Sequence, residues 1–142
     1  MIDVQDAGKI RHLLEHHDDS IVNFATTHTI SFPPQMTIRD VFREYRNKAG
    51  SADVVMYIYV VDESGKLVGV LDIRELLQAS PEDRLQDVMT TNLVTLNAST
   101  AVKDAAKLFV RYSFRAIPIV DDGGVMIGAI PYRDVMDLQH RT

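Results

Sequence analysis

The N-terminal part of the chain carries a histidine pattern that could bind zinc. His12, Glu15 and His16 stand in the sequence His-Leu-Leu-Glu-His, the inverted zinc-protease pattern, in which two histidines bind zinc and the glutamate acts as base. Catalysis also needs a third protein ligand and a substrate cleft, and this pattern lies in a short segment near the N-terminus. Adventitious binding of Zn²⁺ or Ni²⁺ by His12, His16 and His17 is the other interpretation. We expect that the chain is not an enzyme.

Acidic pairs form a second group of residues with possible chemistry. Asp62-Glu63 and Asp121-Asp122 each precede a glycine. Mg²⁺ keeps several waters and is commonly held by one or two carboxylates, so a weak site between facing acidic surfaces needs no sharp motif. The structural alternative is that these residues hold the backbone of hairpin turns, where Asp and Gly are common. Both interpretations remain open from the sequence.

An internal repeat organises the chain. At an offset of 64 residues, the stretch 18–46 pairs with 82–110 without a gap, and after a break of five residues the match resumes where 60–65 meets 119–124. The first copy therefore carries an insertion near residues 46–52. Two copies of about 60 residues do not suit a solenoid, which needs several stacked units of roughly 20 to 50 residues. We predict two similar lobes that share one core, with any ligand site duplicated between them.

Composition limits the classes of function. The 142 residues are about one domain, and an apolar share of 46% with a charged share of 25% is typical of a folded protein. The longest apolar run, 54–61, is too short to cross a bilayer, and we expect neither membrane insertion nor secretion. A formal charge of -5 with scattered basic residues argues against nucleic acid as a partner. The absence of cysteine excludes disulfides and thiolate chemistry.

Each copy has the pattern of a β-α-β-β-α unit. Apolar β-branched runs alternate with capped helical segments, and an Asp- and Gly-containing turn joins the last two strands. We predict an α/β (α+β) fold of two such repeats related by pseudo-twofold symmetry. The predicted boundaries are 1–17 for an N-terminal helix or linker, 18–79 for repeat 1 and 80–142 for repeat 2. The predicted elements are 30–32, 38–46, 55–61, 67–71 and 73–77 in repeat 1, and 94–96, 102–112, 116–120, 125–130 and 132–138 in repeat 2.

The tandem unit resembles the CBS-domain pair, or Bateman module, over about residues 18–140. The resemblance is carried by 60–71 and 116–130, which read VVDESGKLVGVL and AIPIVDDGGVMIGAI. The stretches 76–89 and 17–20 are similar to the cytosolic CBS region of MgtE-type magnesium transporters. The resemblance implies a non-catalytic regulatory module that binds an adenine nucleotide, ATP or AMP, between its two copies. It also implies a homodimer formed through the CBS repeats, a location in the cytoplasm, and a membrane-transport domain of the same or another chain as partner.

The resemblance further implies a ribose signature of Gly, an apolar residue, Ser or Thr, two spacers and Asp. Repeat 1 departs from it, with Asp72 at the hydroxyl position and Glu75 at the acid, while repeat 2 has Pro131 but keeps Asp134. One carboxylate can accept hydrogen bonds from both ribose hydroxyls, so we expect the nucleotide in the repeat-2 cleft. Otherwise Asp134 merely begins a helix and the arginines are solvated. The candidate set is Thr95, Arg115, Ile117, Pro118, Arg133 and Asp134, in which Ile117 and Pro118 would wall the base and Arg115 or Arg133 would meet phosphate.

For the acidic pairs, the resemblance implies magnesium sensing. Mg²⁺ bound at Asp62, Glu63, Asp121 and Asp122 would offset carboxylate repulsion and favour a compact arrangement, and low Mg²⁺ would let the parts separate. Two other functions remain open. One is a stand-alone CBS pair that senses adenine nucleotide and regulates another partner, and the other is a purely structural dimerisation module.

Overall fold

Two antiparallel hairpins form the centre of the protein. The structure, a computed structural model, describes residues 19–135. Strands β2 (Tyr57–Val61) and β3 (Leu67–Asp72) form the first hairpin, and β5 (Ala116–Val120) and β6 (Met126–Pro131) form the second. A short parallel strand completes each sheet, β1 (Ser31–Phe32) beside β2 and β4 (Leu96–Asn97) beside β5. The predicted α+β class and the repeated strand pattern are confirmed.

Side-chain caps begin two of the helices, whereas the helix at 102–112 begins after Ala101 without one. In α2 (Ile38–Lys48), the Thr37 hydroxyl accepts a hydrogen bond from the backbone N–H of Asp40, and a short 3-10 turn, η2 (Ala49–Ser51), follows. Asp72 and Glu75 form a reciprocal capping box at α3 (Ile73–Gln78). The remaining helical segments are η1 (Ile21–Phe24), α4 (Leu85–Val88) and α5 (Val102–Tyr112), and residues 132–135 begin the predicted last helix. The predicted N-terminal helix lies outside the described residues.

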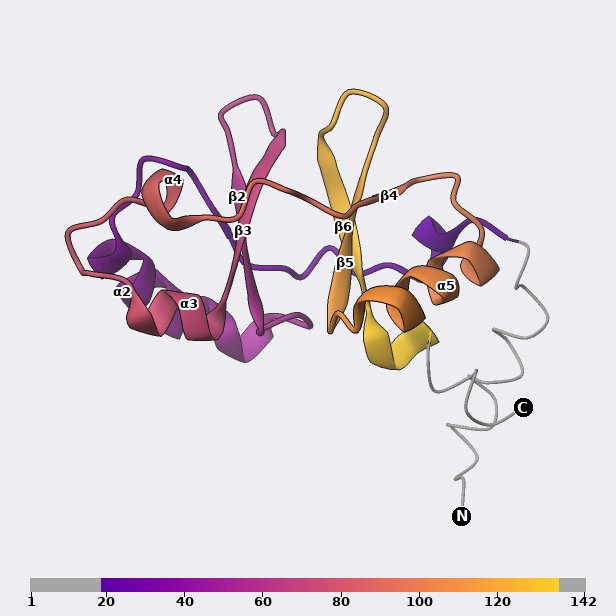
Figure 1. Ribbon diagram of the computed structural model, residues 1–142, viewed down its shortest axis with the longest axis horizontal. Helices are drawn as coiled ribbons and strands as arrows, with labels where there is room; N and C mark the ends of the chain where they lie inside the picture. Colours follow the sequence, from indigo (N-terminus) through magenta and orange to yellow (C-terminus); the bar gives the residue numbers. More distant parts are fainter. Residues whose placement is uncertain (1–18, 136–142) are drawn as a thin grey trace, which may run out of the picture.

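The helices lie outside and the two hairpins face each other in the middle (Figure 1). Each sheet therefore packs one face on its own helices and the other face on the opposite sheet. Tyr59 and Leu67 of the first lobe meet Ala116 and Ala129 of the second in a shared apolar layer. The predicted two lobes are present, but each has its own buried core, and the layer between them is a third, smaller cluster. Within residues 19–135, none of the helices is long and apolar enough to cross a bilayer.

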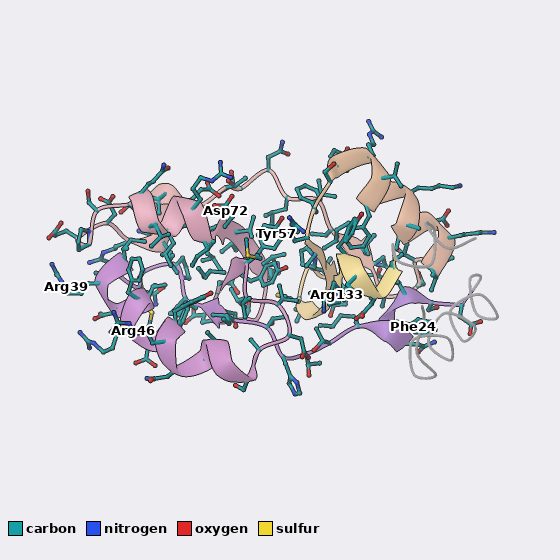
Figure 2. All side chains as sticks on the ribbon, turned by 90° about the horizontal axis from the view of Figure 1, so that it is seen from below. Phe24, Arg39, Arg46, Tyr57, Asp72 and Arg133 are labelled. Atoms are coloured by element: carbon teal, nitrogen blue, oxygen red, sulfur yellow. The ribbon has the colours of Figure 1, made fainter. Side chains whose placement is uncertain are left out.

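The segments that lead each repeat are exchanged between the lobes. Ile21 in η1 is fully buried in the core of the second lobe, and Leu85 in α4 is fully buried in the core of the first. Figure 2 shows Phe24, the last residue of η1, on the side of the second lobe. Equivalent backbone bonds fix the exchange, since the Ile21 N–H donates to Thr100 and the Leu85 N–H donates to Met36. Each lobe thus contains a piece of the other repeat.

The exchange explains two glycines at equivalent positions. The leading segments cross β3 and β6 closely, and short bridges join Thr90 to Val70 and Thr26 to Ala129. A Cβ on Gly128 would lie 2.8 Å from the Thr26 carbonyl oxygen, and one on Gly69 would overlap the Met89 side chain. Gly128 therefore allows a close backbone approach, and Gly69 leaves room for the Met89 side chain.

Candidate functional site

Two cavities lie where the lobes meet. The larger cavity has a volume of about 660 Å³, within the range of about 300–1,000 Å³ that is usual for small-molecule sites. Its walls come from the leading segment of repeat 1, the residues before β2, the start of β5 and the end of β6. The lining residues are Thr26, Asp53, Val54, Val55, Met56, Arg115, Pro131, Tyr132, Arg133 and Asp134.

Backbone contacts hold Arg115 at the wall of the larger cavity. Its carbonyl accepts a hydrogen bond from the N–H of Tyr132 at 2.7 Å, and its own N–H donates to the hydroxyl of Tyr57 at 3.3 Å. The Tyr132 ring packs edge-on against Phe109, with ring centroids 5.8 Å apart. Figure 2 shows Arg133 at the junction of the lobes, opposite Tyr57. Arg115, Arg133 and Asp134 of the second lobe therefore line this cavity together.

The opposite wall of the larger cavity carries a small polar cluster. The Asp53 carboxylate accepts a hydrogen bond from the Thr26 hydroxyl and lies 3.4 Å from Nδ1 of His28. The Asp53 N–H donates to the His28 carbonyl at 2.8 Å, and the His28 N–H donates to the Thr26 hydroxyl oxygen. Asp53 follows the insertion of repeat 1, so the position of this carboxylate is specific to that repeat.

The smaller cavity, about 200 Å³, has mainly apolar and aromatic walls. The capping box of Asp72 and Glu75 faces it, and both carboxylates already accept backbone hydrogen bonds, at 2.8 and 3.1 Å. The Tyr59 hydroxyl is buried without a hydrogen-bond partner in the described chain, and burial raises the pKa of this phenol strongly. The lining residues are Tyr57, Tyr59, Val70, Asp72, Glu75, Thr90, Asn92, Leu93, Val94, Phe114, Ala116 and Pro118.

The predicted nucleotide residues separate into two groups. Arg115, Arg133 and Asp134 line the larger cavity together. Ile117 is fully buried in the core of the second lobe, and Pro118 lines the smaller cavity. Adjacent residues of β5 point to opposite faces of the sheet, so these two residues lie in different surroundings, and their role beside a base stays a prediction.

The residues that line the two cavities differ from the predicted site residues in other ways. Thr95 is not among the lining residues of either cavity, although its neighbour Val94 lines the smaller one. Thr26, Asp53 and Tyr132 line the larger cavity and were missed by the sequence reasoning. The insertion in repeat 1 was the available signal for Asp53, because a segment without an equivalent in the other copy changes one cleft only.

The acidic pairs lie in two hairpin turns that touch each other. The Leu67 N–H donates to the Gly124 carbonyl, and the Met126 N–H donates to the Gly65 carbonyl. These two bonds place the end of the turn containing Asp62-Glu63 beside the end of the turn containing Asp121-Asp122. Figure 1 shows the two hairpin tips pointing in the same direction.

The inner acid of each pair holds its own turn. Asp62 Oδ1 accepts hydrogen bonds from the Ser64 N–H, the Ser64 hydroxyl and the Lys66 N–H, and the Ser64 hydroxyl bond is the main reason that the Asp62 pKa is lowered. Asp121 Oδ1 accepts from the N–H groups of residues 123 and 125.

The second acid of each pair, Glu63 or Asp122, contributes less to the structure of its turn. Asp122 accepts from the Asn97 amide at 2.9 Å, and Glu63 is exposed. In residues 19–135 no three His, Asp or Glu side chains gather as a ready metal site. The turn interpretation therefore accounts for Asp62 and Asp121, and magnesium binding at the four acids stays a prediction. The His12 to His16 pattern lies outside the described residues.

Comparison with known proteins shows where this architecture recurs. The model of the family described as "CBS domain" matches residues 21–82 and again 85–141. The chain is 31% identical over 97% of its length to the magnesium transporter MgtE of Thermus thermophilus, and 30% identical over 96% to that of Bacillus subtilis. It spans about a third of the length of these curated relatives, 31% and 30% respectively.

Solved structures agree with this relationship. The cytosolic domain of the Mg²⁺ channel MgtE in complex with ATP is 32% identical, with a TM-score of 0.82, and the match covers 96% of this chain and 55% of that one. The CBS pair of a putative Mg²⁺ transporter from Shewanella oneidensis, at 18% identity and a TM-score of 0.74, shares the fold.

Proposed function

Since this chain belongs to the CBS-domain family, we propose that it is a non-catalytic regulatory module of a magnesium transporter. It senses Mg²⁺ and an adenine nucleotide on the cytosolic side of the membrane and passes that signal to a transport domain of the same or another chain. The similarity to MgtE proteins over 97% of the chain, together with its coverage of only 31% of their length, supports this role. A homodimer formed through the CBS repeats is part of the proposal.

The single observation that carries the nucleotide part is the lining of the larger cavity. Asp134 lines this cavity and would accept hydrogen bonds from a ribose diol, and the guanidinium groups of Arg115 and Arg133 would bind a phosphate. The cavity volume of about 660 Å³ is sufficient for a nucleoside phosphate. The ATP complex of a 32% identical structure supports the ligand class.

The smaller cavity is the alternative position for the base. Tyr57 and Phe114 supply aromatic walls that suit a purine. Its volume of about 200 Å³ is below the usual range, and its two carboxylates are engaged in the helix cap. We therefore place the nucleotide in the larger cavity.

Magnesium sensing is proposed for the joined hairpin turns. The exposed faces of Asp62, Glu63, Asp121 and Asp122 concentrate negative charge at one edge of a chain whose formal charge is -5. Hydrated Mg²⁺ between these acids and a second acidic surface would offset their repulsion and stabilise the closed arrangement. Asp62 and Asp121 can contribute while holding their turns, because the hydrogen bonds that hold each turn use one carboxylate oxygen, Oδ1.

Thermal unfolding across a Mg²⁺ series at fixed ionic strength, with and without ATP or AMP, tests the proposal. A ligand that binds only the folded state must raise the melting temperature. Magnesium sensing is supported if Mg²⁺ raises the melting temperature more than Na⁺ does, and if this difference is lost when the four acids are changed to amides. A rise with nucleotide alone would favour a stand-alone nucleotide sensor that regulates another partner. No rise with either ligand would favour a dimerisation module.

A further inference from the structure

The outward face of α5 carries basic and apolar side chains together. Lys103, Lys107 and Arg111 follow one another at intervals of four residues, so they lie on one stripe of the helix, and all three are exposed. Val110, which is 66% exposed, and Tyr112, which is 40% exposed, lie beside Arg111 at the C-terminal end of the helix. Figure 1 shows α5 on the outer side of the second lobe.

The Tyr112 ring is held in place at the end of this face. It stacks on Phe114, with ring centroids 5.5 Å apart and an angle of 17° between the planes, and the Arg111 guanidinium lies 5.2 Å from its centroid. The helix ends at this point because Ser113 adopts a left-handed conformation, with a φ of 57°. Phe114 in turn packs against the core of the second lobe. The core therefore fixes the tyrosine ring while part of the ring stays exposed.

The cations of α5 are only weakly offset by acids of the same helix. Asp104 is the one acidic residue of α5, and its Oδ1 lies 3.7 Å from Nζ of Lys107. The Lys107 and Asp104 side chains are 78% and 54% exposed, so solvent screens their attraction. The face therefore has an excess of positive charge, on a chain whose formal charge is -5.

The equivalent helix of repeat 1 has a different exposed face. Both α2 and α5 have 11 residues, and at the offset of 64 residues Val110 matches Arg46 and Tyr112 matches Lys48. The exposed residues of α2 are all polar. The fold of the repeat therefore does not require the combination of cations with exposed apolar groups, which distinguishes α5 from α2.

Cations beside exposed apolar and aromatic groups are typical of helices that bind at the surface of an anionic bilayer. Cations alone would suit an acidic polypeptide equally well, but exposed Val110 and a fixed tyrosine ring favour a partner with an apolar layer beneath its charges. We infer that the outward face of α5 binds anionic lipid headgroups, with Lys107 and Arg111 at the headgroups and Val110 and Tyr112 at the boundary with the acyl chains. The inference rests on one part of the proposed function, the attachment to a transport domain, which brings the module near a bilayer.

Cosedimentation of the full chain with lipid vesicles tests the inference. Vesicles of phosphatidylcholine with about 40% phosphatidylglycerol are compared with vesicles of phosphatidylcholine alone, at about 0.05 M salt to limit screening. We expect binding to the anionic vesicles to be at least about tenfold tighter, and to be lost at about 0.5 M salt. The net charge of the chain opposes part of the attraction, so the expected affinity is modest.

Two double variants of equal charge locate the lipid-binding face. Lys107→Gln with Arg111→Gln should weaken binding to anionic vesicles by about twentyfold, since each cation near the surface contributes about fivefold. Arg43→Gln with Arg46→Gln removes the same charge from α2 and is the matched control, which should keep most of the affinity. Val110→Ser, with all cations intact, should weaken binding severalfold. Melting temperatures equal to that of the wild type show that the variants are folded.

The outcomes separate the inference from the proposed function. Equal binding to neutral and anionic vesicles, or no binding to either, overturns the inference, and so does an equal loss of affinity in the two double variants. If the chain binds polyglutamate as tightly as anionic vesicles, with the same dependence on Lys107 and Arg111 and no effect of Val110→Ser, the partner is an acidic polypeptide and the inference is wrong. The responses to Mg²⁺ and nucleotide are measured without lipid, so the proposed sensing function stands or fails separately.

Discussion

The hydroxyl of Tyr57 accepts a hydrogen bond from the backbone N–H of Arg115 at 3.3 Å. Tyr57 lines the smaller cavity and Arg115 lines the larger one, so this bond connects the two cavities across the lobes. A ligand that moves the tyrosine ring would also disturb the backbone that presents a guanidinium group to the proposed phosphate site.

Tyr57→Phe should therefore weaken both the fold and the site. Loss of the bond is expected to lower the free energy of unfolding by about 0.5–1.5 kcal/mol. Nucleotide affinity should fall by a factor of a few, because Arg115 loses one of its two backbone contacts. Urea unfolding and calorimetric titration measure the two effects.

Variants in each cavity should locate the nucleotide. Asp134→Asn removes the charge that we assign to ribose recognition and should weaken nucleotide binding by about tenfold or more, since a hydrogen bond to a charged group is worth about 1.5–3 kcal/mol. Phe114→Ala opens the wall of the smaller cavity and should leave affinity nearly unchanged. The reverse pattern in a calorimetric titration would move the site to the smaller cavity.

Gly128→Ala should destabilise the fold. The added Cβ would lie 2.8 Å from the backbone carbonyl oxygen of Thr26, which cannot move without breaking the bridge between Thr26 and Ala129. We expect a loss of about 1–3 kcal/mol, the usual cost of overpacking. Gly50→Ala is the matched control, because its Cβ would meet no atom within 4 Å. Urea unfolding of both variants measures this loss. Equal stabilities would contradict the close contact between residue 128 and the Thr26 carbonyl oxygen.

Ile21→Ala tests the exchange of leading segments. Ile21 is fully buried in the core of the second lobe, so its truncation should cost about 2–5 kcal/mol. Leu85→Ala should cost a similar amount through the first lobe. Val22→Ala, in the same turn but only partly buried, should cost clearly less. If Ile21→Ala proves as mild as Val22→Ala in urea unfolding, the leading segment does not contribute to the core as described.

Asp62 should make stability depend on acid pH. Hydrogen bonds, first of all that from the Ser64 hydroxyl, lower the pKa of this carboxyl below its ordinary value of 3.8. A carboxyl with a lowered folded-state pKa stabilises the protein above the unfolded-state value and loses that contribution as the pH falls through the folded-state value. Asp62→Asn should therefore flatten the decline in stability below about pH 4. Urea unfolding between pH 2.5 and 6 gives the comparison, and Glu63→Gln removes the neighbouring charge as a control.

The repeat and its elements follow from the sequence because local signals agree with the fold. Thr37 caps α2 and the Asp-Gly turns close both hairpins, as their residue types indicate. The site was harder to predict, because the two repeats meet through non-local contacts. Alternation along β5 sends Ile117 into the core and Pro118 to the smaller cavity, and only the pairing of the lobes brings Asp53 to the cavity of Asp134.

The crossing of the leading segments also bears on how the chain acquires its structure. During synthesis the segment containing Ile21 is made first, but the core that receives it is completed only after α5, β5 and β6 have emerged. The first lobe likewise waits for Leu85. Each repeat needs a segment of the other to complete its core. A cut between residues 79 and 80 would leave two fragments, each lacking one segment of a core. We therefore expect the two copies to fold and unfold together as one cooperative unit.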